Sequence, residues 1–123
     1  MRIQGIRKDL LSLILQVGRE RHPFEYAGLL REKDGIIEEL NLLPGTVSNE
    51  HSASLILDMM PLDTHVAGSV HSHPNGVLVP SNADLSFFSR TGRYHLIIGF
   101  PYDERNWVCF GANGSLIEME VVR

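Results

Sequence analysis

The chain has 123 residues and a mass of 13.8 kDa, with 43% hydrophobic and 21% charged residues, which is typical of one globular domain and leaves no room for a second core. Eleven Lys and Arg against fifteen Asp and Glu give a net charge of -4, the wrong sign for a phosphate backbone, so we expect no nucleic-acid partner. Signal-peptide and membrane-spanning patterns are not found, and the single cysteine, Cys109, lies in an apolar run, so we expect a buried thiol, no membrane partner and a cytoplasmic location.

The first half of the chain predicts a helix followed by a hairpin. Apolar residues recur at helical spacing from Asp9 to about Glu20, and His22-Pro23 is a stop signal. Two strand-like runs follow at 24–30 and 35–42, and Asp34-Gly35 between them favours a hairpin turn. Residues 43–52 are polar and turn-rich, and we expect a mobile connection there.

The second half predicts mostly strands, with one further helix. We expect strands at 53–57, 65–70, 94–100, 106–111 and 115–122, and a helix that begins at Ser81 and reaches about Arg90. Asn113-Gly114 is expected to form a hairpin turn between the last two strands. The pattern predicts one mixed α/β (α+β) domain over residues 1–123, with helices packed on a central sheet.

The segment from His71 to Asp84 carries the chemistry. Two histidines at i and i+2 of an extended chain project to the same side, so the rings of His71 and His73 can reach one metal ion. After Pro74 a short loop leads to a helix start, where Asp84 can supply a third ligand. Two nitrogens and one carboxylate leave a fourth position for water, as in catalytic zinc sites.

Such a site also needs a group that takes a proton from the water and returns it to the leaving group. Glu25 is our candidate, since a carboxylate at the start of a buried strand is otherwise expensive to keep there.

Each of these residues also has a simpler interpretation. Ser81 and Asp84 have the spacing of a helix capping box, a His-x-His pair can serve as hydrogen-bonding strand residues, and Glu25 can be a solvated charge. For the other histidines, His22, His51, His65 and His95, we expect surface positions or hydrogen bonds in the core. The combination of spacings favours the metal site.

At these residues the chain resembles the JAMM (MPN+) metalloproteases, whose signature is a distant Glu, then H-[ST]-H-P, a short loop and S-x-x-D. The matching residues are Glu25, His71-Ser72-His73-Pro74, Ser81 and Asp84. The short archaeal members of the family are the most similar in length and order of elements. The resemblance implies a cytidine-deaminase-like fold with a mostly antiparallel sheet flanked by helices.

The resemblance also implies roles for the residues. His71, His73 and Asp84 would bind one Zn²⁺ per chain with water as the fourth ligand, Glu25 would be the general acid and base, and Ser81 would donate to the oxyanion. The implied activity is hydrolysis at the C-terminal Gly-Gly tail of a ubiquitin-like modifier protein.

Two other functions stay open at this stage. One is a peptidase acting on an adduct of a ubiquitin-like sulfur-carrier protein, and the other is a non-catalytic MPN scaffold. The residues 77–79 of the loop could contact a substrate, contact a second subunit or pack inward. The oligomeric state, including a homodimer, is also open.

Overall fold

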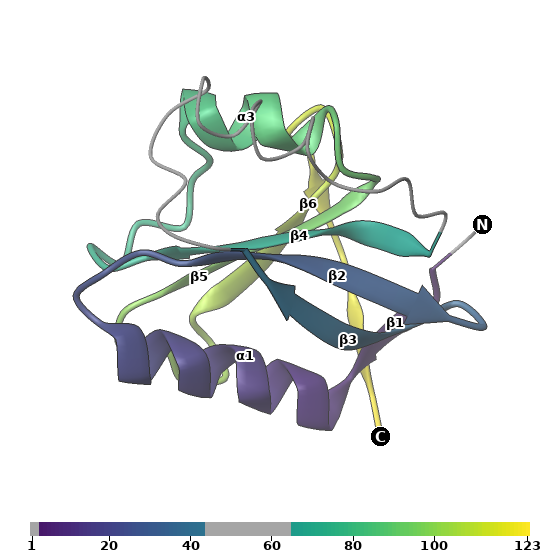
Figure 1. Cartoon of the computed structure of the whole chain (residues 1–123), viewed down its shortest axis with the longest axis horizontal. Coiled ribbons are helices and arrows are strands. Elements are labelled where there is room, and N and C mark those ends of the chain that lie inside the picture. The colour runs from purple at the N-terminus through teal and green to yellow at the C-terminus, as the bar shows by residue number, and fades with distance from the viewer. Residues whose placement is uncertain (1–2, 44–64) are drawn as a thin grey trace.

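The computed structural model describes residues 3–43 and 65–123. Strands and two helices follow one another in the described chain, with both helices packed on a sheet (Figure 1). In order these elements are β1 (Gly5–Arg7), α1 (Lys8–Arg21), β2 (Ala27–Lys33), β3 (Ile36–Leu42), β4 (Val66–His73), α3 (Asn82–Phe88), β5 (Tyr94–Gly99), β6 (Trp107–Phe110), β7 (Leu116–Ile117) and β8 (Glu120–Val122).

The described strands form one eight-stranded sheet in the order β7-β6-β5-β4-β2-β3-β1-β8. Four of its strand pairs are antiparallel, and three are parallel: β4 with β5, and β1 with both β3 and β8. The prediction of a mixed fold with a mostly antiparallel sheet and flanking helices is therefore confirmed.

The last two strands show that the sheet is curled. β7 and β8 lie at opposite ends of the strand order, yet only Glu118 and Met119 separate them in the chain. Two residues span less than about 15 Å even with their neighbours included, so the two edges must approach one another. The prediction of one continuous strand over 115–122 is wrong, because the segment divides in two to pair with β6 at one edge and with β1 at the other.

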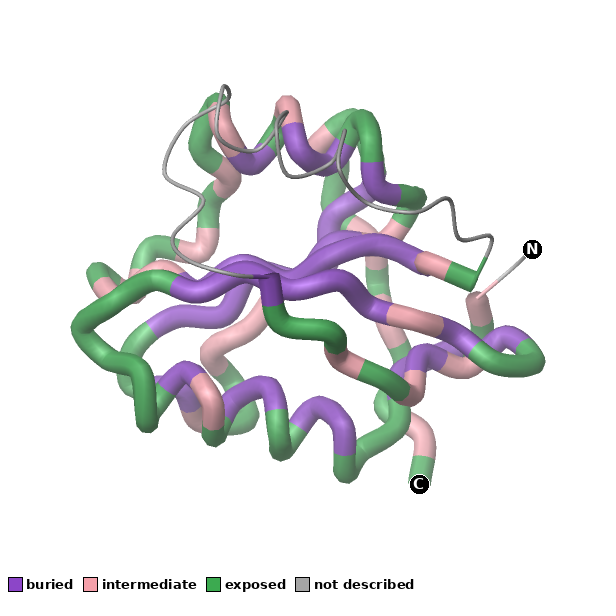
Figure 2. The backbone as a smooth tube through the Cα atoms, viewed as in Figure 1, coloured by how far each residue is buried: buried purple, intermediate pink, exposed green. Residues whose placement is uncertain are grey.

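The main core lies between α1 and the sheet. Ile14 on the apolar face of α1 is fully buried there together with Ile6 and Leu30 from the sheet. Figure 2 shows that the buried parts of α1 face the sheet. The predicted helix is confirmed, beginning one residue earlier than expected, after Arg7, with His22 as the residue that follows its end. Cys109 belongs to the same core and is buried, as predicted.

Both predicted hairpin turns are present. Asp34 and Gly35 have φ angles of 53° and 83°, which suit a tight turn between antiparallel strands, and Gly114 has a φ of 83° between β6 and β7. β1 was not predicted from the sequence. The predicted connection at 43–52 falls, after Leu43, outside the described residues, as does the predicted strand at 53–57.

On the other face of the sheet, α3 covers β4 and β5 (Figure 1). Ser81 precedes its first residue as predicted, but the helix ends at Phe88 rather than near Arg90. The N–H groups of Arg90 and Thr91 bond to the carbonyls three residues back, so the helix tightens and stops.

A close approach of backbones joins β4 to β5. A Cβ atom on Gly68 would lie 1.6 Å from the carbonyl oxygen of Tyr94, so only glycine fits. The parallel pairing of β4 and β5, in which Gly68 lies opposite Tyr94, is the contact that requires this glycine.

Candidate metal centre

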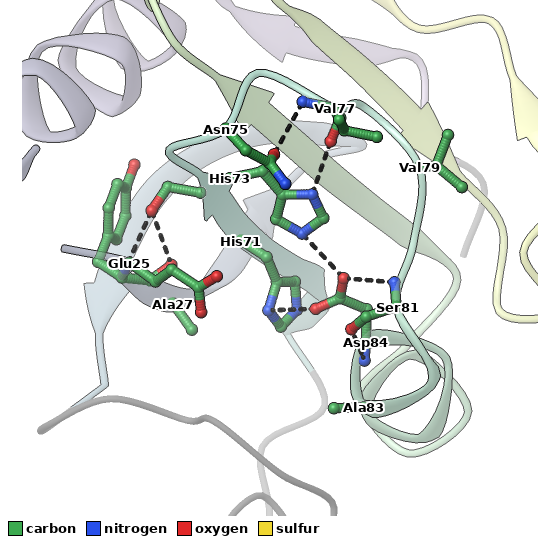
Figure 3. Close-up of a pocket in the computed structure, with 12 residues that line it drawn as sticks. Glu25, Ala27, His71, His73, Asn75, Val77, Val79, Ser81, Ala83 and Asp84 are labelled. Atoms are coloured by element: carbon green, nitrogen blue, oxygen red, sulfur yellow. Dashed lines mark hydrogen bonds and ion pairs between the residues drawn. The ribbon is translucent and has the colours of Figure 1, made fainter. Parts of the chain in front are cut away.

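β4 extends through the whole His-Ser-His sequence and carries both imidazoles to one side. Asp84, on the first turn of α3, faces them (Figure 3). His73 Nε2 lies 2.9 Å from Asp84 Oδ2, and His71 Nδ1 lies 3.5 Å from Asp84 Oδ1. The structure therefore brings together the three residues for which the sequence predicted a shared site.

The helix cap holds the Asp84 carboxylate in place. Asp84 Oδ2 accepts the backbone N–H of Ser81 at 2.9 Å, and Ser81 Oγ accepts the backbone N–H of Asp84 at 3.1 Å. The capping box is thus real. It does not compete with a role in the site, because the same carboxylate also reaches both histidines.

His73 has two acceptors, one at each ring nitrogen. Nδ1 lies 2.7 Å from the carbonyl oxygen of Val77, and Nε2 faces the Asp84 carboxylate. Since neither oxygen can donate, both nitrogens carry protons in this arrangement. Partial burial acts to lower the pKa of His73, but the hydrogen bonds to Asp84 and Val77 and the charges of Asp84 and Glu25 together raise it.

The pKa of the Asp84 carboxyl is lowered. Burial acts to raise this pKa, but the hydrogen bond from His73, the nearby His71 and the N–H of Ser81 outweigh it. Asp84 is consequently a carboxylate over the physiological range and available as an oxygen ligand.

His71 is the more deeply buried of the two histidines. Burial is the main cause that lowers its pKa to about 4, so the ring is neutral near pH 7. The edge of the ring packs against Phe87, with ring centroids 5.0 Å apart, and its Nε2 lies 2.9 Å from Ser69 Oγ. A neutral imidazole is the form that binds metal ions.

Glu25 lies across the cleft from Asp84, with His71 and His73 between them (Figure 3). The expectation that Glu25 begins a buried strand is wrong, because the residue is exposed and β2 begins two residues later. The argument from the cost of burying a carboxylate therefore does not apply to Glu25. Strand pairing places Glu25 beside the histidines.

Ser72, between the two histidines, fixes the backbone next to Glu25. Its Oγ accepts the N–H of Tyr26 at 2.7 Å, and its own N–H donates to the carbonyl of Tyr26 at 2.9 Å. In the adjoining ladder Ala27 pairs with His71, and the antiparallel count continued by two residues brings Glu25 opposite His73.

A cleft of about 300 Å³ contains all five predicted site residues. Ser81 lies at its edge and is exposed; because its Oγ accepts from Asp84, its hydroxyl hydrogen is left to donate. In the loop before α3, inward packing, which was one of the predicted alternatives, is found for one residue. Leu78 packs inward, whereas Val77 and Val79 are exposed and line the cleft.

Comparison with known proteins identifies the family of the chain. The family described as prokaryotic homologs of the JAB domain matches residues 7–110. The chain belongs to this family. It is 42% identical over 130 residues to a probable metalloprotease of Haloferax volcanii, covering 98% of this chain and 80% of that protein.

Two solved structures extend the similarity of this JAB-family chain to the fold. A JAB1/MPN domain protein from Archaeoglobus fulgidus is 37% identical, with a TM-score of 0.80, over 97% of this chain and 99% of the other. A structure described as a JAMM metalloprotease-like zinc site in the proteasome and signalosome is 36% identical, with a TM-score of 0.78, over 98% and 99%. The expectation of a JAMM-type metalloprotease is confirmed at the level of the family. None of the described helices is long and apolar enough to cross a bilayer.

The donor set of this JAB-family chain suits zinc, although the donors touch one another. Within residues 3–43 and 65–123, no group of three or more His, Cys, Asp or Glu side chains is already spaced so that it could hold a metal ion. Two ligands of a tetrahedral zinc lie roughly 3.4 Å apart, since each bond is about 2.1 Å long. The His71–Asp84 separation of 3.5 Å meets this value, and the His73–Asp84 separation of 2.9 Å requires a shift of about half an ångström and loss of one proton.

Sequence reasoning did not connect two residues behind the site, Ser69 and His95. His95 was expected either at the surface or in a core hydrogen bond, and the structure shows the second, with Nδ1 2.7 Å from Ser69 Oγ. Ser69 precedes His71 by two residues, so the alternation of a strand places it on the same face, and this signal was available. The parallel register that brings His95 beside it was not.

Proposed function

We propose that this chain is a zinc-dependent peptidase that hydrolyses the bond at the C-terminal Gly-Gly tail of a ubiquitin-like modifier protein. The observation that carries the proposal is the convergence of His71, His73 and Asp84 in one cleft, with Glu25 across from them. Membership of a family with a relative named as a probable metalloprotease supports it.

Three side chains would hold one zinc ion in each protein chain, and water would complete the coordination. His71 would bind through Nδ1, His73 through Nε2, and Asp84 through its carboxylate, since these are the atoms that face one another. When bound, zinc supplies Lewis acidity and lowers the pKa of a coordinated water from about 15.7 toward about 7.

Glu25 is the proton carrier of the proposed reaction. Its exposed carboxylate takes one proton from water as the water oxygen forms a bond with the carbonyl carbon of the terminal glycine. The same carboxyl group then gives that proton to the amine nitrogen as the C–N bond breaks. One water is consumed, and a carboxylic acid and a free amine are released; the acid then ionises in solution.

Ser81 stabilises the charge that develops on the carbonyl oxygen. Its hydroxyl hydrogen is available because the oxygen, not the hydrogen, serves the helix cap. One such donor is worth about 10² to 10³ in rate.

The form of the cleft supports a narrow substrate. Its volume of about 300 Å³ is at the lower end of the range of about 300–1,000 Å³ for ligand pockets, and the apolar side chains of Val77 and Val79 line it. Glycine residues without side chains could enter such a space in extended form. We place the reaction in the cytoplasm, which the single buried cysteine favours.

Metal content is the first test. We expect about one zinc per chain by mass spectrometry of the purified protein, and loss of that zinc in His73→Ala and Asp84→Ala, each shown to be folded by circular dichroism. A wild-type protein that takes up no zinc even after reconstitution would exclude the metallopeptidase and leave a binding scaffold.

Cleavage assays then decide the substrate. A β-grasp modifier joined through its terminal glycine to a lysine side chain is compared with the same modifier carrying a C-terminal cysteinyl adduct, at equal concentration. Faster turnover of the lysine conjugate supports modifier removal. Faster turnover of the cysteinyl adduct would replace it by the sulfur-carrier peptidase.

A further inference from the structure

A chain of buried hydrogen bonds runs from the backbone to the rear of His71. Ser69 and His95 are both fully buried, and they are direct partners in the ladder between β4 and β5. Ser69 Oγ lies 2.7 Å from His95 Nδ1 and 2.9 Å from His71 Nε2. At the far end, His95 Nε2 lies 3.0 Å from the carbonyl oxygen of Gly92.

The position of each hydrogen follows from the end of this chain. The Gly92 carbonyl can only accept, so His95 Nε2 carries a hydrogen. The ring of His95 is fully buried and stacks on Phe88 with centroids 4.3 Å apart. Burial disfavours an imidazolium and outweighs the opposite effect of the backbone carbonyls of Gly92 and Phe88, so its Nδ1 is a bare acceptor. The one hydroxyl hydrogen of Ser69 therefore goes to His95.

This leaves Ser69 Oγ able only to accept from His71. His71 Nε2 must then carry the ring hydrogen, and the lone pair is at Nδ1, the atom that faces Asp84 across 3.5 Å. The ring orientation is fixed by the same bonds, together with the edge contact to Phe87.

We propose that Ser69 and His95 are positioning residues, which hold His71 in the Nδ1-unprotonated tautomer and aim that nitrogen at the metal. The proposal rests on the zinc site proposed above. Mutation of residues that hydrogen-bond to metal-bound histidines typically lowers metal affinity by about 10- to 100-fold. Neither residue touches the substrate or the ion, and their effect passes through His71 alone.

The tautomers can be measured in the metal-free wild-type protein. Long-range ¹H–¹⁵N correlation spectra of histidine-labelled protein are expected to show His71 and His95 both protonated at Nε2 and bare at Nδ1. A hydrogen on Nδ1 of His71 would overturn the proposal, whatever the zinc affinity.

Zinc affinity is measured by competition with a chromophoric chelator. We expect Ser69→Ala to weaken binding by about 10- to 100-fold. Ser69→Thr retains the hydroxyl and is expected to bind within about threefold of wild type. His95→Phe preserves the stacking on Phe88 but frees the hydroxyl hydrogen of Ser69 to donate to His71 Nε2, so we expect the His71 tautomer to reverse and the affinity to fall.

Thr91→Val is the matched control. Thr91 is buried and its hydroxyl donates to the carbonyl of Phe87 at 2.8 Å, without touching His71. Equal losses of zinc affinity in Thr91→Val and Ser69→Ala would overturn the positioning role, as would an unchanged affinity in Ser69→Ala. A wild-type protein without zinc affinity would contradict the proposed function instead, and the tautomer measurement would still test the hydrogen-bond chain.

Discussion

Single side chains in this molecule combine structural and chemical roles through different atoms. The Asp84 carboxylate caps a helix through Oδ2 and faces His71 through Oδ1, and Ser81 accepts a bond through its oxygen while its hydrogen stays available. A residue with a well-satisfied structural role can therefore still belong to the site. The two interpretations of the S-x-x-D spacing are compatible for this reason.

A substitution at Glu25 is expected to lower activity without changing stability. Because its side chain is exposed and precedes the strand, we expect Glu25→Gln to change the free energy of unfolding by less than about 0.5 kcal/mol. Removal of the proton carrier should lower kcat/KM by about 10² to 10⁴. The measurement is conjugate cleavage beside urea unfolding, with zinc content unchanged.

Glu118→Gln is the matched control for this substitution. Glu118 is an exposed carboxylate between β7 and β8, outside the cleft. Its replacement should leave cleavage as in wild type. If Glu25→Gln cleaves at the wild-type rate, Glu25 is not the general base.

The buried His95 makes the stability of the fold depend on pH. Burial, partly opposed by backbone hydrogen bonds, lowers its pKa to about 4, whereas the unfolded chain has about 6.5. Between these values the unfolded state binds the additional proton, so stability is complete above about pH 6.5 and falls as the pH decreases toward 4. The slope reaches at most about 1.4 kcal/mol per pH unit.

Urea unfolding from pH 7 to 4.5, with chelator present, measures this slope. The free energy of unfolding of His95→Phe should decrease less steeply with falling pH than that of the wild type. The difference in slope should correspond to at most one proton, about 1.4 kcal/mol per pH unit. Identical slopes in the two proteins would show that His95 does not contribute to the acid sensitivity.

At the scale of elements, strand β4 and helix α3 form the site together. β4 presents the two histidines, the seven residues of α3 begin where Ser81 caps them, and Val77 in the connecting loop accepts the hydrogen bond of His73. A change at the start of α3 should therefore alter both the helix cap and the geometry of the site.

Ser81→Ala tests this coupling. Loss of the cap should destabilise the protein by about 1 kcal/mol, and loss of the hydroxyl donor should lower kcat by about 10² to 10³. Ser81→Thr retains both functions and is expected to remain close to wild type in both measurements. A decrease in stability without a decrease in kcat would remove Ser81 from the reaction and leave it as a cap.

The elements also show what the sequence could reveal. His71, His73 and Asp84 were predictable, because strand alternation and a loop of suitable length bring them together locally. β1 and the division of the last strand were not, since three-residue strands carry little pattern and depend on distant partners. The exposure of Glu25 and the Ser69–His95 pair depend on register between strands, which single-strand patterns do not contain.

At the scale of the whole molecule, the site and the main core lie on opposite faces of the sheet. α1 covers the core face, and the proposed ligands lie on the side of α3. We therefore expect the fold to form without metal, because the main core lies away from the site and the Asp84 carboxylate already has hydrogen-bond partners in His73 and Ser81.

Chelation should abolish cleavage and leave the fold intact. We expect the circular dichroism spectrum to be unchanged by a chelator. Returning zinc should raise the unfolding midpoint, because a free concentration 1,000 times the Kd adds about 4 kcal/mol to the free energy of unfolding. Scanning calorimetry with and without chelator checks this. Unfolding on chelation would contradict a fold that is complete without metal.

The pairing of β1 with β8 is expected to slow the folding of the molecule. Gly5 and Glu120 are neighbours in the sheet, although almost the whole chain separates them. Contacts between such distant segments carry a large entropic cost before they contribute energy, and proteins rich in them typically fold in about milliseconds to seconds. We therefore expect the curled sheet to be completed late in folding, with the β1 edge open to pairing with another chain until β8 reaches it.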